Sequence, residues 1–263
     1  MSKLPISVCL ISGAEARRIG RALESVAGWT SEIVIVLYED VRDATEEIAR
    51  NLGARVFREP WKGHIAQKNS AAAKATQPWL LGLDADEAVS PELREEIVRR
   101  FARPGGAEAF AAYSFPRCTL FCGRWIRHGD WYPDRKTRLW KKGCAEWGGV
   151  DPHDKIHVRG RTGRLKGDLM HDHGEGINGL IAKIARYTDD FARDAQQAGR
   201  GATWLDLAVR PAWRFVRSYC LRAGFLDGWQ GGYIAWLTAF YTATRYAKVR
   251  AAAPRATSHD RSP

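Results

Sequence analysis

The sequence lacks any long hydrophobic run. Its 263 residues contain no stretch of about eighteen consecutive apolar residues, so no segment is a clear candidate for a membrane span. The first residues lead directly into a strand-like segment, without the longer apolar stretch and small-residue cleavage site of a secretory signal. We therefore expect a chain that acts in the cytoplasm.

Cysteine is scarce, which argues against a disulfide framework. The chain has five cysteines, an odd number. Cys118 and Cys122 lie four residues apart, but no matching Cys or His pair follows them, which argues against a structural zinc site. Reduced thiols are the expectation, in keeping with a cytoplasmic protein.

Acidic residues are under-represented in the C-terminal part. Residues 1–100 hold 14 Lys and Arg against 15 Asp and Glu, whereas residues 101–263 hold 27 against 15. The net charge of +11 therefore comes entirely from the second part. This asymmetry predicts an acidic partner for that region, such as anionic lipid, a phosphorylated substrate or nucleic acid. No helix-turn-helix, zinc-finger or RNP-type pattern is present, so we do not expect nucleic acid.

The first hundred residues alternate strand and helix patterns. Apolar runs predict strands, and apolar spacing of three to four residues predicts helices between them. The predicted strands are residues 6–11, 32–37, 54–57 and 79–83, and the predicted helices are 14–26, 44–52, 65–75 and one that starts at Pro91 behind Ser90 as N-cap. Repeated strand–helix units predict an α/β protein with a parallel, doubly wound sheet.

Two carboxylates follow the fourth predicted strand. Asp84 and Asp86 come directly after the buried run 79–83, at the carboxyl end where open α/β sheets bind ligands. On an extended segment, residues i and i+2 point the same way, so both carboxylates could face one cation. Hard oxygen ligands suit Mg²⁺ or Mn²⁺ carrying a diphosphate. A solvated turn is the alternative, because Asp is common in turns.

The remaining chain changes character twice. Residues 107–170 predict short strands between turns, with many tryptophans that suit core packing or stacking on sugars. Residues 176–248 predict helices. The expected divisions are a nucleotide-sugar-binding half (1–105), an acceptor-side half of the same domain (106–175), a helical membrane-interface region (176–250) and a disordered tail (251–263).

The C-terminal helices combine positive charge with aromatic bulk. Arg210, Arg214 and Arg217 would form one basic stripe on a continuous helix, unless Pro211 starts the helix and leaves Arg210 outside. Residues 228–244 carry no formal charge and include five aromatic residues. This segment fits an element in the membrane interface, while a helical hairpin packed on the rest of the protein is the alternative.

Several motifs recur in an order that resembles the inverting family-2 glycosyltransferases of GT-A fold, and more narrowly their bacterial lipopolysaccharide-core β-glucosyltransferase branch. The resemblance runs from about residue 5 to 248. It is carried by residues 7–11 with 23–26, the W-x-G-x-x-x-Q-K-N block at 61–69, Leu83-Asp84-Ala85-Asp86-Glu87, and the segments 138–140, 147–149, 153–155, 167–171 and 224–228.

The resemblance implies transfer of a sugar, UDP-glucose being the expected donor, to a lipid-linked or lipopolysaccharide-core acceptor with inversion. It implies a GT-A fold with a mostly parallel sheet, helices on both faces and C-terminal amphipathic helices. On the donor side, the resemblance implies that Asp84 contacts the ribose side of the nucleotide and that Lys68 and Arg138 contact phosphate. It implies that Asp86 binds Mg²⁺ or Mn²⁺, with His171 as a further ligand. On the acceptor side, Asp154 is the implied base, Asp151 is a competitor for that role, and His153 would orient the acceptor. For both histidines, ordinary packing is an equal alternative.

Two segments depart from the family pattern. The usual T-K-N-E reads Ser12-Gly13-Ala14-Glu15 here, which leaves Ser12 and Glu15 as candidate nucleotide contacts. Tyr38 replaces the Asp that usually holds the nucleobase, so Tyr38 would stack on the base and Glu39 or Asp40 would supply the hydrogen bond.

We therefore expect a metal-dependent glycosyltransferase on the inner face of the bacterial inner membrane, held there by anionic lipid. The alternative is a glycosyltransferase-like module that lost its donor site and binds a membrane or a partner.

Overall fold

The computed structural model describes residues 3–151, 153–172, 174 and 176–252, without the side chain of His153. Most of the predicted tail, residues 253–263, lies outside this description. The chain divides into two compact units. The first, the sheet unit, comprises Met1–Thr119 and Pro133–His173, and the second, the helical unit, comprises Leu120–Tyr132 and Gly174–Pro263. The predicted limits had placed residues 120–132 with the acceptor-side half.

The sheet unit begins with strand–helix alternation and continues with strands. Its elements are β1 (Leu4–Ser12), α1 (Ile19–Ala27), β2 (Thr30–Tyr38), α2 (Thr45–Asn51), β3 (Arg55–Glu59), α3 (His64–Lys74), β4 (Trp79–Gly82), β5 (Glu87–Val89), α4 (Pro91–Ala102), η1 (Ala107–Ala109), β6 (Ala112–Phe121), β8 (Asp134–Lys141), β9 (Ala145–Val150), β10 (His153–Val158), β11 (Thr162–Arg164) and β12 (Leu169–His171).

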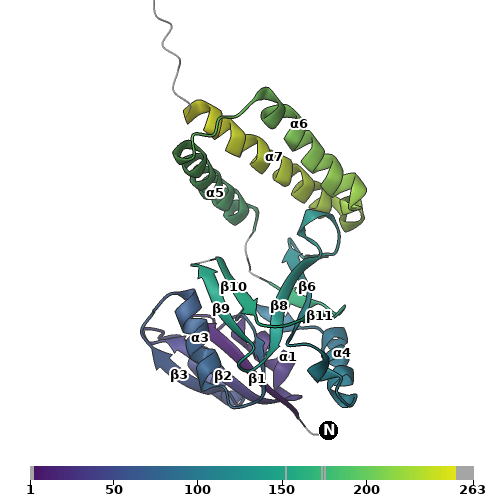
Figure 1. Ribbon diagram of the computed structural model, residues 1–263. Coiled ribbons are helices and arrows are strands. Elements are labelled where there is room, and N and C mark those ends of the chain that lie inside the picture. The colour runs from purple at the N-terminus through teal and green to yellow at the C-terminus, as the bar shows by residue number, and fades with distance from the viewer. Residues whose placement is uncertain (1–2, 152, 173, 175, 253–263) are drawn as a thin grey trace, which may run out of the picture. The chain divides into compact units, whose positions relative to one another are not determined.

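The main sheet has the strand order β3-β2-β1-β4-β8-β6-β12-β5. Strands β1 to β4 pair in parallel, so their carboxyl ends meet at one edge (Figure 1). Strand β8 runs antiparallel to both β4 and β6, while β9 and β10 form a separate antiparallel hairpin. The prediction of a mostly parallel α/β sheet is confirmed, and this sheet edge is where the site must be sought.

Helices cover both faces of the sheet, as predicted. One core cluster joins Ile6, Val8 and Leu10 of β1 to apolar residues of α1 and α4. The opposite cluster joins Cys9 of β1 to Ala71 of α3 and to tryptophans of β8 and β9. Alternate residues of β1 thus point into different cores, which explains why the strand reads as a continuous apolar run.

Two helix starts illustrate how far local sequence predicts boundaries. Ser90 caps α4 as predicted, because its hydroxyl accepts the backbone N–H of Leu93. Helix α1 starts at Ile19, not at residue 14. The backbone N–H of Glu15 instead donates to the Thr45 hydroxyl, and that of Ala16 to the Asp43 carboxylate, so α2 holds this segment as a loop.

The helical unit contains the remaining elements: β7 (Arg124–Ile126), η2 (Gly129–Trp131), α5 (Ile177–Gln197), α6 (Trp204–Val216), the π-helical turn η3 (Arg217–Leu221), η4 (Gly224–Asp227) and α7 (Gly228–Ala252). A capping box between Thr203 and Asp206 starts α6, so Arg210 and Pro211 both lie inside the helix. Among the described residues, no helix is long and apolar enough to cross a membrane.

Candidate active site

The candidate site lies at the carboxyl edge of the parallel strands. Ser12 ends β1 and pairs with Leu37, the residue before Tyr38 at the end of β2. Asp84 and Asp86 follow β4, whose partner is also β1. The sheet therefore brings three predicted contact segments to one edge.

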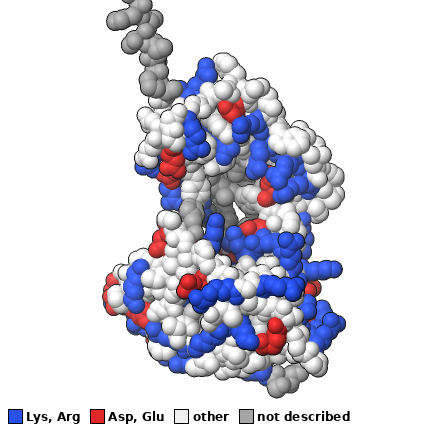
Figure 2. Space-filling view, viewed as in Figure 1, with Lys and Arg blue, Asp and Glu red and all other residues white. Residues whose placement is uncertain are grey.

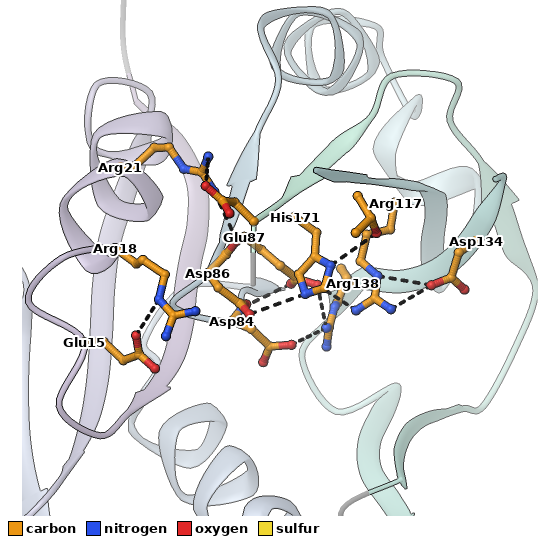
Figure 3. A network of polar contacts seen from close by, with 12 residues as sticks. Glu15, Arg18, Arg21, Asp84, Asp86, Glu87, Arg117, Asp134, Arg138 and His171 are labelled. Atoms are coloured by element: carbon orange, nitrogen blue, oxygen red, sulfur yellow. Dashed lines mark hydrogen bonds and ion pairs between the residues drawn. The ribbon is translucent and has the colours of Figure 1, made fainter. Parts of the chain in front are cut away.

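Asp84 and Asp86 lie on a tight turn and not on an extended segment. The N–H of Glu87 donates to the Asp84 carbonyl at 2.9 Å, and the Asp84 N–H donates to Glu87 Oε2 at 3.1 Å. The turn sends the two aspartates to different partners (Figure 3). The prediction that Asp84 and Asp86 lie on an extended segment was therefore wrong.

Asp84 lies between two cations. Lys68 Nζ is 2.8 Å from its Oδ1, and Arg138 Nη2 donates to its Oδ2 at 2.5 Å. Burial alone raises the pKa of Asp84, but Arg138 and Lys68 outweigh that effect and hold the pKa well below its usual value. Asp84 is therefore a fixed negative charge that orients both cations.

The ion pairs continue in both directions from Asp84. On one side, Arg138 also contacts Glu87 Oε1 at 3.0 Å, and Glu87 is fully buried. On the other, Lys68 Nζ is 2.9 Å from Asp154 Oδ2. The resulting chain, Glu87–Arg138–Asp84–Lys68–Asp154, joins β5, β8, the turn after β4, α3 and β10. Burial alone lowers the pKa of Arg138, but the adjacent carboxylates of Asp84 and Glu87 outweigh that effect, so the pKa is raised.

Trp147 of β9 packs over both cations of this chain. Its ring centroid lies 4.4 Å from Lys68 Nζ and 5.2 Å from the guanidinium carbon of Arg138. Gly82 makes room for the indole, since a Cβ there would come within 2.8 Å of it. Buried Trp147 therefore shields the ion pairs from water on one side.

The ion-pair chain borders an open cavity of about 510 Å³. Asp84, Arg138, Trp147 and Asp154 line it. The other lining residues are Arg117, Arg135, Lys136, Thr137, Lys155 and Ile156. Asp154 offers this cavity its Oδ1, which makes no hydrogen bond to any described residue, while Oδ2 is held by Lys68. The geometry suits a carboxylate that receives a proton from a bound hydroxyl group.

Asp151 has a different position. Its Oδ1 accepts the backbone N–H of Ile65 at 3.0 Å, in the first turn of α3. Gly63 has a φ of +91° and leaves space for this carboxylate, which a Cβ would meet at 2.2 Å. Asp151 therefore stabilises a helix start, which leaves Asp154 as the better candidate base.

Asp86 and His171 form the candidate metal pair. Asp86 Oδ2 is 3.4 Å from His171 Nε2, and the ring's Nδ1 is 3.3 Å from the Thr119 hydroxyl. Burial raises the pKa of Asp86, but the contact with His171 outweighs it and lowers the pKa. Among the described residues, no group of three or more His, Cys, Asp or Glu side chains could hold a metal. One carboxylate and one imidazole fit an ion that takes its other ligands from a diphosphate and water.

The remaining predicted nucleotide contacts, at the ends of β1 and β2, are not among the residues that line the cavity. Glu15 pairs with Arg18 at 2.9 Å, and the Tyr38 hydroxyl donates to Asp40 at 2.6 Å, which raises the Tyr38 pKa. Ser12 is buried and Glu39 is exposed. Their roles stay predictions, as does that of His153, whose side chain lies outside the described residues.

Sequence reasoning missed Glu87 as a buried counter-charge and Trp147 as a cover for the cations. The signal for Glu87 was its position directly after Asp86. For Trp147 the signal was a tryptophan beside two glycines, but nothing in the local sequence indicated which cations it would meet.

Comparison with known proteins gives consistent results. The family described as Glycosyl transferase family 2 matches residues 7–157. An uncharacterised glycosyltransferase of Rickettsia prowazekii is 30% identical over 260 residues, covering 93% of this chain and 86% of that protein. The lipopolysaccharide core biosynthesis glycosyltransferase LpsC of Rhizobium meliloti is 27% identical, covering 98% and 99%.

Among solved structures, a mannosyltransferase of Pyrobaculum calidifontis in complex with GDP-Man and Mn²⁺ is similar in fold. The TM-score is 0.52 at 14% identity, over 94% of this chain and 87% of that one.

Proposed function

Because this chain belongs to glycosyl transferase family 2, we propose that it is a metal-dependent inverting enzyme that moves glucose from UDP-glucose to a lipid-linked or lipopolysaccharide-core acceptor. The observation that carries this proposal is the Asp84–Lys68–Asp154 linkage beside the cavity. It joins a candidate donor-binding carboxylate to a candidate base through one cation.

The donor binds at the carboxyl ends of β1, β2 and β4. Ser12 and Glu15 contact the nucleoside, Tyr38 stacks on the base with Glu39 as hydrogen-bond acceptor, and Asp84 contacts the ribose side. The register of β1 with β2 supports this grouping, because Ser12 and Tyr38 end adjacent strands. The Mn²⁺ and GDP-Man bound to the similar Pyrobaculum calidifontis enzyme are compatible with it.

The departing diphosphate is stabilised by positive charge. Asp86 and His171 would hold Mg²⁺ or Mn²⁺, and the ion would neutralise the negative charge that develops on the diphosphate. Lys68 supplies a second positive charge from α3. Arg138 lines the cavity and is a further phosphate contact, although it, like Lys68, also pairs with two carboxylates.

The acceptor hydroxyl group loses its proton to Asp154. Inversion by a single displacement requires a base on the face opposite the leaving group. Lys68 fixes the orientation of Asp154 through Oδ2, which leaves Oδ1 for the acceptor. The name of the Rhizobium meliloti relative supports a lipopolysaccharide-core acceptor.

The helical unit holds the enzyme on the anionic inner face of the inner membrane. Trp204, Leu205 and Trp213 of α6 are 71%, 68% and 55% exposed, and Trp229 of α7 is 59% exposed. Figure 2 shows Lys and Arg side chains spread over the face of this unit that it presents, with fewer Asp and Glu. Exposed aromatic residues among cations suit an interfacial site on anionic lipid.

A nucleotide-sugar screen tests the enzyme assignment. The melting temperature of the full chain is measured with UDP-, GDP-, CMP- and dTDP-sugars, each with and without Mn²⁺, followed by assays of nucleotide release and transfer. UDP-glucose with Mn²⁺ should give the largest rise, because a ligand that binds only the folded state stabilises it. If none of these nucleotide-sugars raises the melting temperature, the result would instead favour a non-catalytic module. That is the alternative suggested by the presence of Tyr38 in place of the usual Asp.

A further inference from the structure

The cavity carries more positive charge than its ion pairs neutralise. Six cations line it or contact its lining, namely Lys68, Arg117, Arg135, Lys136, Arg138 and Lys155. Four carboxylates accompany them, namely Asp84, Glu87, Asp134 and Asp154. The surplus makes the cavity attractive to an anion.

Three lining cations supply the surplus, although one of them, Arg117, also lies 3.5 Å from Glu87 Oε1 of the ion-pair chain. Asp134 is shared by Arg117, at 2.7 Å, and Lys136, at 3.1 Å. Lys155 is exposed and makes no ion pair with any described residue. Asp134 thereby holds two cations side by side, while a third follows the candidate base directly in sequence.

Strand order places Arg117 and Lys136 opposite the nucleotide side. The candidate nucleoside contacts end β1 and β2, on one side of β4, whereas Lys136 on β8 and Arg117 on β6 lie on its other side. Neighbouring strands are about 4.8 Å apart, so β6 lies roughly 10 Å beyond β4. Because β8 is antiparallel to β4, residues 137 to 135 continue outward past the end of β4. A donor on β1 and β2 leaves this part of the cavity to the acceptor.

We propose that Arg117, Lys136 and Lys155 bind an oxyanion, a phosphate or a carboxylate, carried by the acceptor glycan. The assignment of this anion to the acceptor rests on the proposed function, because the proposed base Asp154 marks the acceptor side of the cavity. An anionic acceptor would replace part of the Asp134 contact and bring its hydroxyl group beside Asp154. A guanidinium and two ammonium groups offer the charge-assisted hydrogen bonds that such a group requires.

The test uses the full chain at constant ionic strength, with glucose 6-phosphate, glucuronate and methyl glucoside as probes. Each is added with and without saturating UDP and Mn²⁺, and the melting temperature is measured. At about ten times its dissociation constant, an anionic probe should raise the melting temperature by about 3 °C or more, and methyl glucoside should not. The larger of the two anion effects distinguishes phosphate from carboxylate.

Two variants and one control assign the effect to these residues. Lys155→Gln should lose most of the rise without harm to the fold, because Lys155 is exposed, and Lys136→Gln with Lys155→Gln should abolish it. Lys141→Gln is the matched control: Lys141 is also on β8 but pairs with Glu108 and does not line the cavity. Equal losses in the control and in Lys155→Gln would overturn the proposal, because the effect would be general screening.

Two further outcomes separate this inference from the proposed function. If UDP with Mn²⁺ abolishes the response to the anionic sugars, these cations bind the donor diphosphate and the inference is wrong. If no nucleotide binds but the lysine-dependent response persists, the oxyanion site stands and the donor assignment fails.

Discussion

The two units use positive charge and apolar surface differently. In the sheet unit, Lys68 and Arg138 are buried, and each contacts two carboxylates. In the helical unit, Arg214, Arg217 and Arg222 converge on the single carboxylate of Asp130, at 3.1, 2.7 and 3.5 Å, and remain partly exposed. The two buried cations of the site each have two carboxylate partners, whereas three arginines of the helical unit share one carboxylate.

Apolar exposure follows the same division. Among the described residues, the large exposed hydrophobic side chains lie in the helical unit, apart from Trp61 and Val150. A unit that leaves this much apolar surface in water beside surplus arginines has the character of a binding surface. The comparison predicts that the proposed catalysis and the proposed membrane attachment are separable by mutation.

The largest expected effect tests the sheet unit alone. Asp86→Asn should lower the rate of transfer and of donor hydrolysis about 10³-fold or more, because it removes the carboxylate of the candidate metal pair. Binding to anionic vesicles should be unaffected. Rates, melting temperature and vesicle sedimentation are measured on the same preparation. Full turnover in this variant would show that Asp86 is not a ligand of a catalytic metal.

A pair of variants then distinguishes the candidate bases. Asp154→Asn should lower kcat about 10² to 10³-fold, because the acceptor hydroxyl loses its proton acceptor. Asp151→Asn should leave kcat nearly intact and cost at most about 1 kcal/mol of stability, since it alters a helix cap. Steady-state kinetics and thermal melts measure both, and the reverse pattern would make Asp151 the base.

The helical unit is tested by Trp213→Glu. Burying a large apolar side chain contributes about 1.5–3 kcal/mol. Replacing the exposed Trp213 by a negatively charged Glu should therefore weaken binding to anionic vesicles about tenfold or more. Trp61→Ala is the control, because Trp61 is exposed to a similar degree but belongs to the sheet unit. Sedimentation with vesicles of graded anionic lipid content measures both, and equal losses would contradict a membrane role specific to the helical unit.

The smallest effect concerns an ion-pair cluster outside the site. Burial raises the pKa of Glu59, but Lys62, Lys74 and Ser70 outweigh it and lower the pKa to about 2. A carboxyl group with a lowered pKa stabilises the fold above its unfolded pKa of about 4.3 and loses that contribution as the pH falls toward 2. Glu59→Gln should therefore lower the melting temperature by a few degrees at pH 7. Melts from pH 7 to pH 2 should show the two proteins converging, and a constant difference would contradict the assignment.

Much of the fold was predictable because its signals are local. The four parallel strands, the helices between them and the Ser90 cap each depend on residues within one segment, and each was found near its predicted position. The start of α1 was not predictable, because Thr45 and Asp43 of a later segment hold residues 15 and 16. Likewise, the sequence around Pro211 did not indicate whether Arg210 lies inside or outside a helix. The Thr203–Asp206 capping box starts α6 seven residues earlier and places Arg210 inside it.

The candidate site was predictable as a list of residues but not as an arrangement. Asp84, Lys68, Arg138 and Asp154 were each singled out, yet their pairing was not foreseen. The Asp84–Glu87 turn replaces the expected extended segment, and Gly82 leaves room for Trp147 over the cations. The pairing of the charged residues and the position of Trp147 depend on which elements become neighbours, which no single segment encodes.

The sequence alone determined the alternation of strands and helices, the acidic pair at the end of a buried strand and the uneven charge, since each is a property of nearby residues or of composition. Only the tertiary structure decided that Lys68 links Asp84 to Asp154 and that Asp151 caps a helix. Those contacts join residues that lie between 16 and 86 positions apart in the chain, and chain folding, not local preference, brings them within hydrogen-bond distance.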